Sequence, residues 1–249
     1  MAITDIADHS AKADSPELDR PRIVPLEQRL NALRAGVLGA NDGIVSTAAV
    51  LVGVAGATVS TGPILTAGLA AAIGGAVSMA LGEYVSVSSQ RDSERALIER
   101  ERRALDEDPA REQRVLAHLY EQRGISADTA HRGAEELSAH DPLAAQVRER
   151  HGIDQDDVAS PWHAAIASFV SFAIGAVLPM LAILLPGPGL RVPVTFAATL
   201  AALALTGAIA AWIGGGSRAR AAVRVVAGGA LALGATYAVG ALLGTTGVL

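Results

Sequence analysis

Four long stretches of the sequence contain no charged residue, and they constrain the fold more than any other feature. They cover residues 43–82, 164–190, 192–217 and 225–249. A helix that crosses a membrane needs about 20 mostly apolar residues, so each of the last three stretches fits one crossing. The first is long enough for two, and turn residues from Thr58 to Pro63 divide it. We therefore predict five membrane-spanning helices, over residues 33–57, 63–89, 163–186, 192–214 and 221–246, because helices of a soluble protein would carry polar faces.

Most of the charge lies in one segment between the second and third predicted spans. The second span is expected to continue as a helix until Asp108 and Pro109, since it contains strong helix formers and no glycine or proline after Tyr84. Three shorter helices should follow: one ends at Gly124, one begins after a Ser126 cap, and one lies between an Asp141 cap and Gly152. The predicted fold is an all-α integral membrane protein with a helical module inserted between spans two and three. Its four regions are a flexible tail (1–28, with a short helix from about Leu26), spans one and two (29–90), the module (91–160) and spans three to five (161–249).

The arginines orient this arrangement through the positive-inside rule. The loop between spans one and two has no cation, and the loop after span three has only Arg191. The segments that precede span one and follow span four are richer in cations (Arg20, Arg22, Arg29, Arg34; Arg218, Arg220, Arg224). The pattern places the N-terminus and residues 91–160 in the cytosol. The Arg- and Ala-rich composition is typical of a protein of a bacterial cell membrane.

Two carboxylates fall within the predicted spans. A carboxylate at membrane depth is costly, and it usually faces the interior of a helix bundle and marks an ion or proton path. Asp42 lies between Gly39 and Gly43, which could loosen the helix and open backbone carbonyls to a ligand; alternatively, Asp42 only caps a broken helix. Glu83 follows Met79 by four residues, so both lie on one face of span two. A thioether beside a carboxylate suits a borderline transition metal better than calcium or magnesium, although Glu83 could also lie at headgroup level.

The charged module has a second set of possible metal ligands. Glu94, Glu101 and Asp108 repeat every seven residues along one helix face, and Glu112 begins the next helix. Clustered carboxylates can bind divalent cations, but mixed acid and arginine helices are more often solvated faces. The sequence contains no cysteine, no phosphate loop and no nucleophile motif. We therefore expect neither an enzyme, nor a resident cofactor, nor a nucleic-acid partner.

Two segments resemble the vacuolar iron transporter family. They are the first-span sequence from Arg29 to Thr47, which includes Asn41 and Asp42, and the second-span sequence from Val77 to Asp92. The resemblance implies a homodimer in the lipid bilayer that exports cytosolic Fe²⁺, and often Mn²⁺, in exchange for protons. It also implies that Asp42 and Met79 line a pathway between the two first spans, to which we add Asn41, with Glu83 at the cytosolic mouth.

In such proteins the cytosolic module gathers metal through glutamates. Glu101 and Glu112 match two of them, whereas Ala104, Val115 and Arg150 stand where further glutamates are expected. Other residues of the module could take part, namely Glu94, Glu136 or His151. The hypothesis is a proton-coupled exporter of divalent iron or manganese. The alternatives are an uncoupled metal channel and a non-transporting membrane sensor or scaffold.

Overall fold

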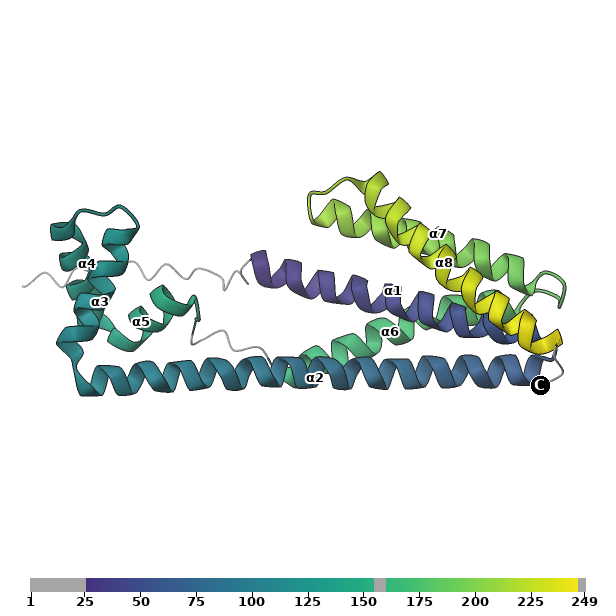
Figure 1. The fold of residues 1–249 in the computed structure, drawn as a ribbon, viewed down its shortest axis with the longest axis horizontal. Helices are drawn as coiled ribbons and strands as arrows, with labels where there is room; N and C mark the ends of the chain where they lie inside the picture. Colours follow the sequence, from purple (N-terminus) through teal and green to yellow (C-terminus); the bar gives the residue numbers. More distant parts are fainter. Residues whose placement is uncertain (1–25, 155–159, 246–249) are drawn as a thin grey trace, which may run out of the picture.

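The computed structural model describes residues 26–154 and 160–245, and every regular element within these ranges is an α-helix. Figure 1 shows their arrangement. In chain order they are α1 (Leu26–Ala57), α2 (Thr61–Glu107), α3 (Pro109–Gln122), α4 (Ala127–His140), α5 (Pro142–His151), α6 (Pro161–Leu184), α7 (Arg191–Ile213) and α8 (Arg218–Thr245).

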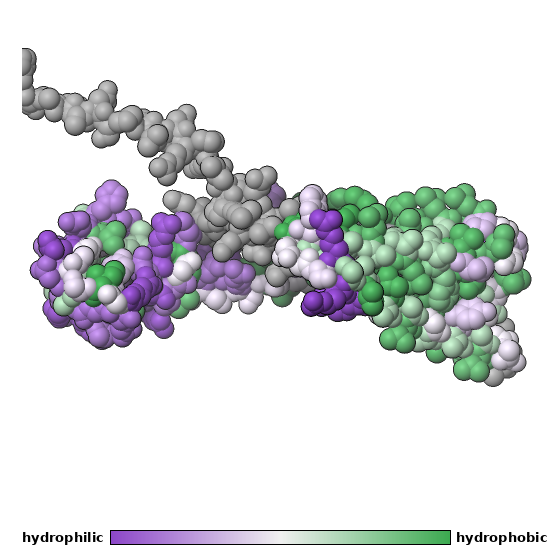
Figure 2. All heavy atoms as spheres, turned by 90° about the horizontal axis from the view of Figure 1, so that it is seen from above, coloured by the Kyte–Doolittle hydropathy of each residue, from purple (hydrophilic) through white to green (hydrophobic). Residues whose placement is uncertain are grey.

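Five of these helices, α1, α2, α6, α7 and α8, are long and apolar enough to cross a membrane. This confirms the number and position of the predicted spans. Figure 2 shows the same division on the surface: hydrophobic atoms cover the end of the molecule that holds the spans, and hydrophilic atoms cover the module. One boundary differs from the prediction, because the helix that begins at Leu26 is not a separate short helix but the first part of α1. Residues 1–25 of the predicted tail lie outside the described ranges.

The longest helix connects the two parts of the molecule. α2 has 47 residues, which correspond to about 70 Å at 1.5 Å per residue. A bilayer core of about 30 Å accommodates less than half of this length, so the second half of α2 projects as a rod that carries the module (Figure 1). The predicted end of this helix is confirmed: Asp108 is its C-cap and Pro109 begins α3.

Capping residues define most ends of the module helices. The predicted Ser126 cap precedes α4, but its side chain makes no capping hydrogen bond, because its hydroxyl donates to the hydroxyl of Thr129 at 3.0 Å. The Asp108 and Asp141 side chains accept hydrogen bonds from the backbone N–H groups of Arg111 and Ala144, each at 2.9 Å. Gly152 ends α5 with a φ of 67°, a left-handed conformation that favours glycine. The three helices pack on one another through a small core of Leu116, Ala117 and Ala134. The module is therefore a folded unit.

α1 lies at the centre of the spans and contacts α2, α6, α7 and α8. Glycines permit its closest approaches. A Cβ atom on Gly43 would overlap the backbone carbonyl of Phe172 in α6, and one on Gly240 in α8 would overlap the carbonyl of Gly53. Small residues let helices in a membrane pack backbone to backbone. They fix α1 between α6 and α8.

Candidate functional site

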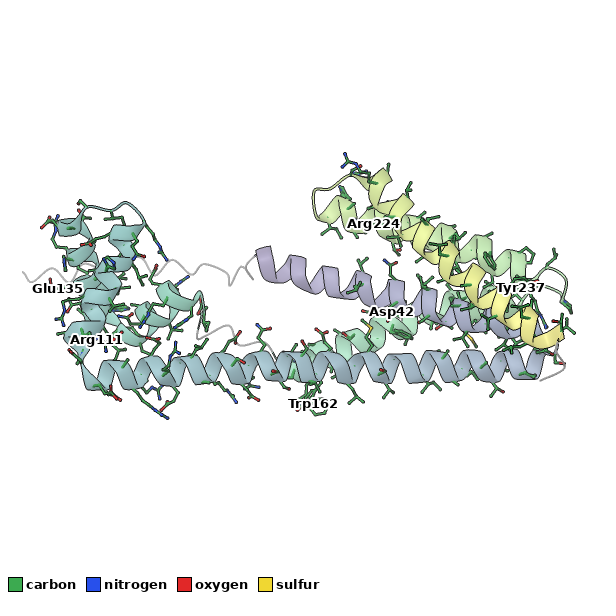
Figure 3. All side chains as sticks on the ribbon, viewed as in Figure 1. Asp42, Arg111, Glu135, Trp162, Arg224 and Tyr237 are labelled. Atoms are coloured by element: carbon green, nitrogen blue, oxygen red, sulfur yellow. The ribbon has the colours of Figure 1, made fainter. Side chains whose placement is uncertain are left out.

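Asp42 and its neighbour Asn41 point in different directions from α1. The Asn41 amide oxygen accepts a hydrogen bond from the Thr206 hydroxyl, which ties α1 to α7. Asp42, labelled in Figure 3, is exposed. Within the described residues its carboxylate has no hydrogen-bond or ion-pair partner; only its backbone carbonyl accepts a bond, from the Ser46 hydroxyl. A single chain thus leaves a membrane-level carboxylate on its surface.

The two glycines beside Asp42 do not loosen the helix, contrary to the expectation from the sequence. α1 is continuous from Leu26 to Ala57. Both glycines instead allow close packing: a Cβ on Gly39 would lie 3.0 Å from the Cβ of Ser171, and Gly43 lies against the backbone of Phe172. The reason is that α6 crosses α1 at this level, and the approach of its backbone requires glycine rather than an opened helix.

Met79 reaches α1 one helical turn before Asp42. Its Sδ atom would be 3.7 Å, and its methyl carbon 3.2 Å, from a Cβ placed on Gly39. The side chain is half-buried and packs against a cluster formed by Ala76, Phe172 and Ala176. The structure therefore brings the predicted thioether to the same level of α1 as the predicted carboxylate, although the two residues belong to different helices.

Glu83 lies at the module end of the second span. The next residue, Tyr84, packs against Trp162 of α6 with ring centroids 4.9 Å apart, and Trp162 is exposed. Exposed tryptophan and tyrosine rings collect at the interface between bilayer and water, so this pair marks the depth at which α2 leaves the membrane. Glu83 is half-buried one residue inside that level. Met79 and Glu83 form a line along α2 from the membrane interface toward Asp42.

A cavity of about 450 Å³ opens on another side of α1, between the module ends of α7 and α8. Asn41 lines it, together with Ser217, Arg220 and Arg224; Arg224 is labelled in Figure 3. Fixed positive charge repels a cation. The arginines therefore make this cavity a poor route for a metal ion, and they distinguish it from the surface that carries Asp42.

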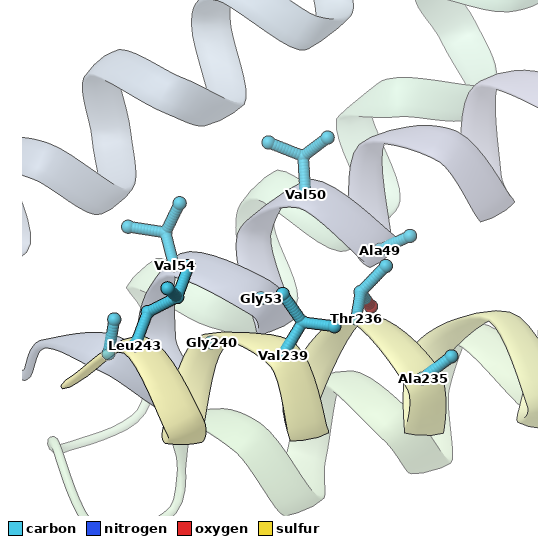
Figure 4. Close-up of a pocket in the computed structure, with 10 residues that line it drawn as sticks. Ala49, Val50, Gly53, Val54, Ala235, Thr236, Val239, Gly240 and Leu243 are labelled. Carbon is cyan, nitrogen blue, oxygen red and sulfur yellow. The ribbon is translucent and has the colours of Figure 1, made fainter. Parts of the chain in front are cut away.

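A second depression lies between α1 and α8 on the surface of the spans. Its volume is about 410 Å³, and Figure 4 shows its lining residues. They are almost all apolar: Ala49, Val50, Gly53, Val54, Ala57, Ala235, Thr236, Val239, Gly240 and Leu243. The hydroxyl of Thr236 bonds to carbonyls of its own helix. This groove has no group that could hold an ion, but it can receive apolar side chains.

In the module, the structure brings together two of the three predicted glutamate ligands. Glu101 of α2 and Glu112 of α3 are both buried and converge on Arg150 of α5, whose Nη1 atom lies 2.6 Å and 2.9 Å from their carboxylate oxygens. Glu94 lies two turns earlier on α2, where its carboxylate accepts a hydrogen bond from Gln90 at 2.8 Å. Among the residues that the structure describes, no three or more His, Asp or Glu side chains form a group able to hold a metal ion.

A separate polar cluster also fixes α5 on α3. Arg123 donates to the Glu149 carboxylate at 2.5 Å and to the Glu149 carbonyl oxygen at 3.1 Å. Burial, together with the neighbouring Glu149 carboxylate, raises the pKa of the Tyr120 hydroxyl above its ordinary value. Glu136, an alternative ligand in the sequence analysis, lines a cavity of about 410 Å³ together with Tyr120 and His140.

Arg191 has a structural role that its sequence context did not reveal. It begins α7 at the end of the spans opposite the module, and only 8% of its surface is exposed. Its Nη1 atom donates to the Val59 carbonyl oxygen at 3.0 Å and its Nη2 atom to the Thr61 hydroxyl at 2.8 Å. It therefore holds the short connection between α1 and α2. The only signal in the sequence was one isolated arginine between two apolar stretches.

Asp42, Met79 and the whole module fall within one match to a known family. Residues 33–241 match the profile of the VIT family. The chain belongs to the VIT family. A vacuolar iron transporter of Acanthamoeba castellanii is 42% identical over 217 residues, which cover 87% of this chain and 80% of that protein. Vacuolar iron transporter homolog 1 of Oryza sativa subsp. japonica is 38% identical over 221 residues, covering 88% and 77% of the two chains.

The likeness extends over nearly the whole length of some VIT relatives. Vacuolar iron transporter homolog 1 of Arabidopsis thaliana is 30% identical over 231 residues, which cover 92% of each chain. Spans and module are therefore parts of one family architecture, and this VIT-family chain is an integral membrane protein of five spans.

Proposed function

We propose that this VIT-family chain is a proton-coupled exporter of divalent iron or manganese that works as a homodimer. The observation that carries the proposal is Asp42: an exposed carboxylate, without a partner among the described residues, on the most central helix of the spans. The relatives named vacuolar iron transporter support metal transport as the activity.

The exposure of Asp42 supports a second copy of the chain as its neighbour. A charged side chain at the centre of a bilayer costs about 2.5–3.5 kcal/mol in insertion measurements, so a lipid-facing position is unfavourable. Leu38 and Val50 are also exposed on α1, and Val50 continues into the apolar groove of Figure 4. A two-fold axis along this strip would cover it in both copies and bring two Asp42 side chains together.

Residues on two helices provide donors that suit a borderline metal. Two carboxylates from two copies of Asp42 supply hard oxygen ligands. Met79 of α2, which packs on Gly39 almost one turn before Asp42, supplies a soft sulfur. This mixture favours Fe²⁺ or Mn²⁺ over Ca²⁺ and Mg²⁺. Glu83 would receive ions at the membrane interface. Asn41 acts indirectly in this scheme, because its amide is bonded to Thr206 and holds α1 in register with α7.

Proton coupling would follow from competition at the same carboxylate. Asp42 binds a metal ion while it is ionised and releases the ion when it becomes protonated, so that metal leaves as protons enter. Export is the direction we propose. The positive-inside rule supports a cytosolic position for the module and for the Arg220 end of α8, which puts Glu83 on the side where the metal would enter. The metal would then move from the cytosol to the opposite side of the membrane.

A flux assay in liposomes tests this function. Purified protein is compared with D42N for uptake of Fe²⁺, Mn²⁺, Zn²⁺ and Ca²⁺, with and without a pH gradient, while an internal dye follows protons. We expect the wild type to move Fe²⁺ or Mn²⁺ with counterflow of protons, and D42N to move neither. The charge-matched control is E99Q, because Glu99 is paired with Arg103 on the exposed surface of α2 outside the membrane.

The alternatives give different results in the same assay. Metal flux that is insensitive to the pH gradient would indicate an uncoupled channel. Absence of flux in a folded protein, with metal binding confined to residues 91–160, would indicate a sensor or scaffold. Wild-type flux in D42N would disprove the role assigned to Asp42.

A further inference from the structure

The charge at the centre of the module comes from three helices. Glu101 and Glu112 have side chains that are only 3% and 5% exposed, and the same nitrogen of Arg150 donates to both carboxylates. The second oxygen of Glu101 lies 3.0 Å from Nε2 of His151. Arg150 itself comes from the last turn of α5, and its side chain is 30% exposed. Two buried acids of α2 and α3 thus share one arginine at the edge of the module.

This arrangement requires a cation. Two ionised carboxylates that approach the same point repel each other, and burial reduces the screening by water. A positive charge between them offsets this repulsion. A guanidinium group stays charged at all physiological pH values and binds carboxylates with defined geometry. Arg150 therefore supplies the positive charge that lets the carboxylates of α2 and α3 meet at α5.

The guanidinium lies where a metal ion would have to bind. Divalent cations need several oxygen ligands at about 2.0–2.6 Å, and the Nη1 atom already lies 2.6 Å and 2.9 Å from the carboxylate oxygens. The two glutamates cannot hold this nitrogen and a metal ion between them at the same time. In addition, the positive charge of Arg150 opposes the approach of another cation.

We propose that Arg150 is the built-in cation of the module: it closes α5 onto α2 and α3 without a metal ion and excludes divalent metal from Glu101 and Glu112. The module of this chain then keeps its closed form whether metal is present or absent. Metal would reach Glu83 and Asp42 directly rather than through the Glu101–Glu112 pair. The part of this proposal that concerns the route of the metal rests on the transport function proposed above. The Mn²⁺ binding experiment does not, because it measures binding to the module and not transport.

Other contacts also dock α5, and one of them provides a matched control. Gln146 donates to the backbone carbonyl of Glu112 at 2.6 Å, and Arg123 binds Glu149 across the α3–α5 contact. Arg123 resembles Arg150 because it also joins these helices through a carboxylate. It differs because it pairs with one partly exposed glutamate rather than with two buried ones. Loss of Arg123 should loosen the module without uncovering a site for metal.

The experiment measures Mn²⁺ binding to the full-length protein in detergent. All variants carry D42N, which removes the proposed membrane ligand, and free Mn²⁺ is followed by electron paramagnetic resonance. We expect the D42N protein to show no Mn²⁺ site that depends on Glu101 and Glu112. The D42N/R150A protein should gain one such site per chain, with affinity raised by about tenfold or more, and its thermal midpoint should rise with Mn²⁺. D42N/R123Q should gain neither.

Two results would overturn the proposal. One is a Mn²⁺ site in the D42N protein that disappears when E101Q and E112Q are added, because Arg150 would then coexist with bound metal. The other is a folded D42N/R150A protein with no gain in Mn²⁺ binding. If R150A does not fold, the comparison of D42N with D42N/E101Q/E112Q decides alone, since both proteins keep Arg150. Equal Mn²⁺ binding by the two proteins supports the proposal, and loss of a Mn²⁺ site in the second overturns it.

Discussion

Met79 of α2 packs directly on Gly39 of α1: a Cβ at position 39 would begin 3.2 Å from the methyl carbon of Met79 and 3.7 Å from its sulfur. Gly39 precedes Asp42 by almost one helical turn. The position of the sulfur relative to α1 therefore depends on a residue that has no side chain. This contact makes the proposed metal path sensitive to very small changes in volume.

The first prediction concerns Gly39 itself. G39A should press on the Cβ of Ser171, 3.0 Å away, and on the Met79 side chain. It should lower the rate of Fe²⁺ or Mn²⁺ flux in liposomes by about tenfold, because small displacements of a binding group weaken its interactions strongly. The control is G74A, on the exposed face of α2, where a Cβ meets nothing within 4 Å. G74A should keep wild-type flux. Equal flux in all three proteins would show that the Gly39–Met79 contact has no part in transport.

Gly43 should respond differently from Gly39, because its neighbour is backbone. A Cβ there would overlap the Phe172 carbonyl, which cannot rotate away as a methionine side chain can. G43A should therefore destabilise the folded protein by about 1–3 kcal/mol through overpacking, seen as a lower thermal midpoint in detergent. The order of midpoints should be G74A at or above wild type, then G39A, then G43A. A G43A midpoint equal to that of G74A would contradict the close α1–α6 approach.

Replacement of Met79 by leucine separates chemistry from packing. M79L conserves volume, so its stability should change by less than about 1.5 kcal/mol, but it removes the soft ligand. Fe²⁺ flux should fall relative to that of hard cations such as Ca²⁺. M180L is the matched control, since Met180 packs against the apolar cluster of Leu51, Ile64 and Ile183. A selectivity unchanged in M79L would assign Met79 to packing alone.

Arg191 is predicted to stabilise the protein without affecting ion choice. R191M removes the two hydrogen bonds that the buried Arg191 side chain donates to the α1–α2 connection, where the acceptors belong to the exposed residues Val59 and Thr61. The expected loss is about 0.5–1.5 kcal/mol for each hydrogen bond removed, measured by thermal unfolding. R218M, which removes an exposed arginine that lies 5.9 Å from the Trp212 ring, should have a much smaller effect. A stable R191M protein would show that the connection holds itself in place.

The elements that the sequence predicted well are those specified by neighbouring residues. Each predicted span is a helix at the predicted position, and the helix ends at Asp108, Asp141 and Gly152 lie where turn chemistry predicts them. Gly39 and Gly43 were read as points where α1 could open. They are points where α6 approaches, because a glycine permits either outcome and only the neighbouring helix decides between them.

The candidate site shows the same division. A carboxylate in an apolar stretch identifies Asp42 from the sequence alone, since the cost of burying charge in a bilayer depends on the residue and its depth. Its exposure in the single chain, and the bond of Asn41 to Thr206 across 165 positions, depend on which faces of α1 the other spans cover. The sequence shows that Arg150 stands where the family resemblance leads one to expect a glutamate. It could not show that one nitrogen meets both glutamates.

The sequence by itself determined the number of spans, the long α2 rod, the caps of the module and the identity of the membrane carboxylate, because hydropathy and capping act over one or two helical turns. The tertiary structure decided that Met79 lies on Gly39, that Asp42 faces outward, and that Arg150 joins Glu101 and Glu112, which lie 49 and 38 positions away. These relations depend on the rotation and crossing of whole helices. The rotation and crossing of helices are set by packing between helix surfaces that are far apart in the chain, so they cannot be predicted from a local pattern of residues.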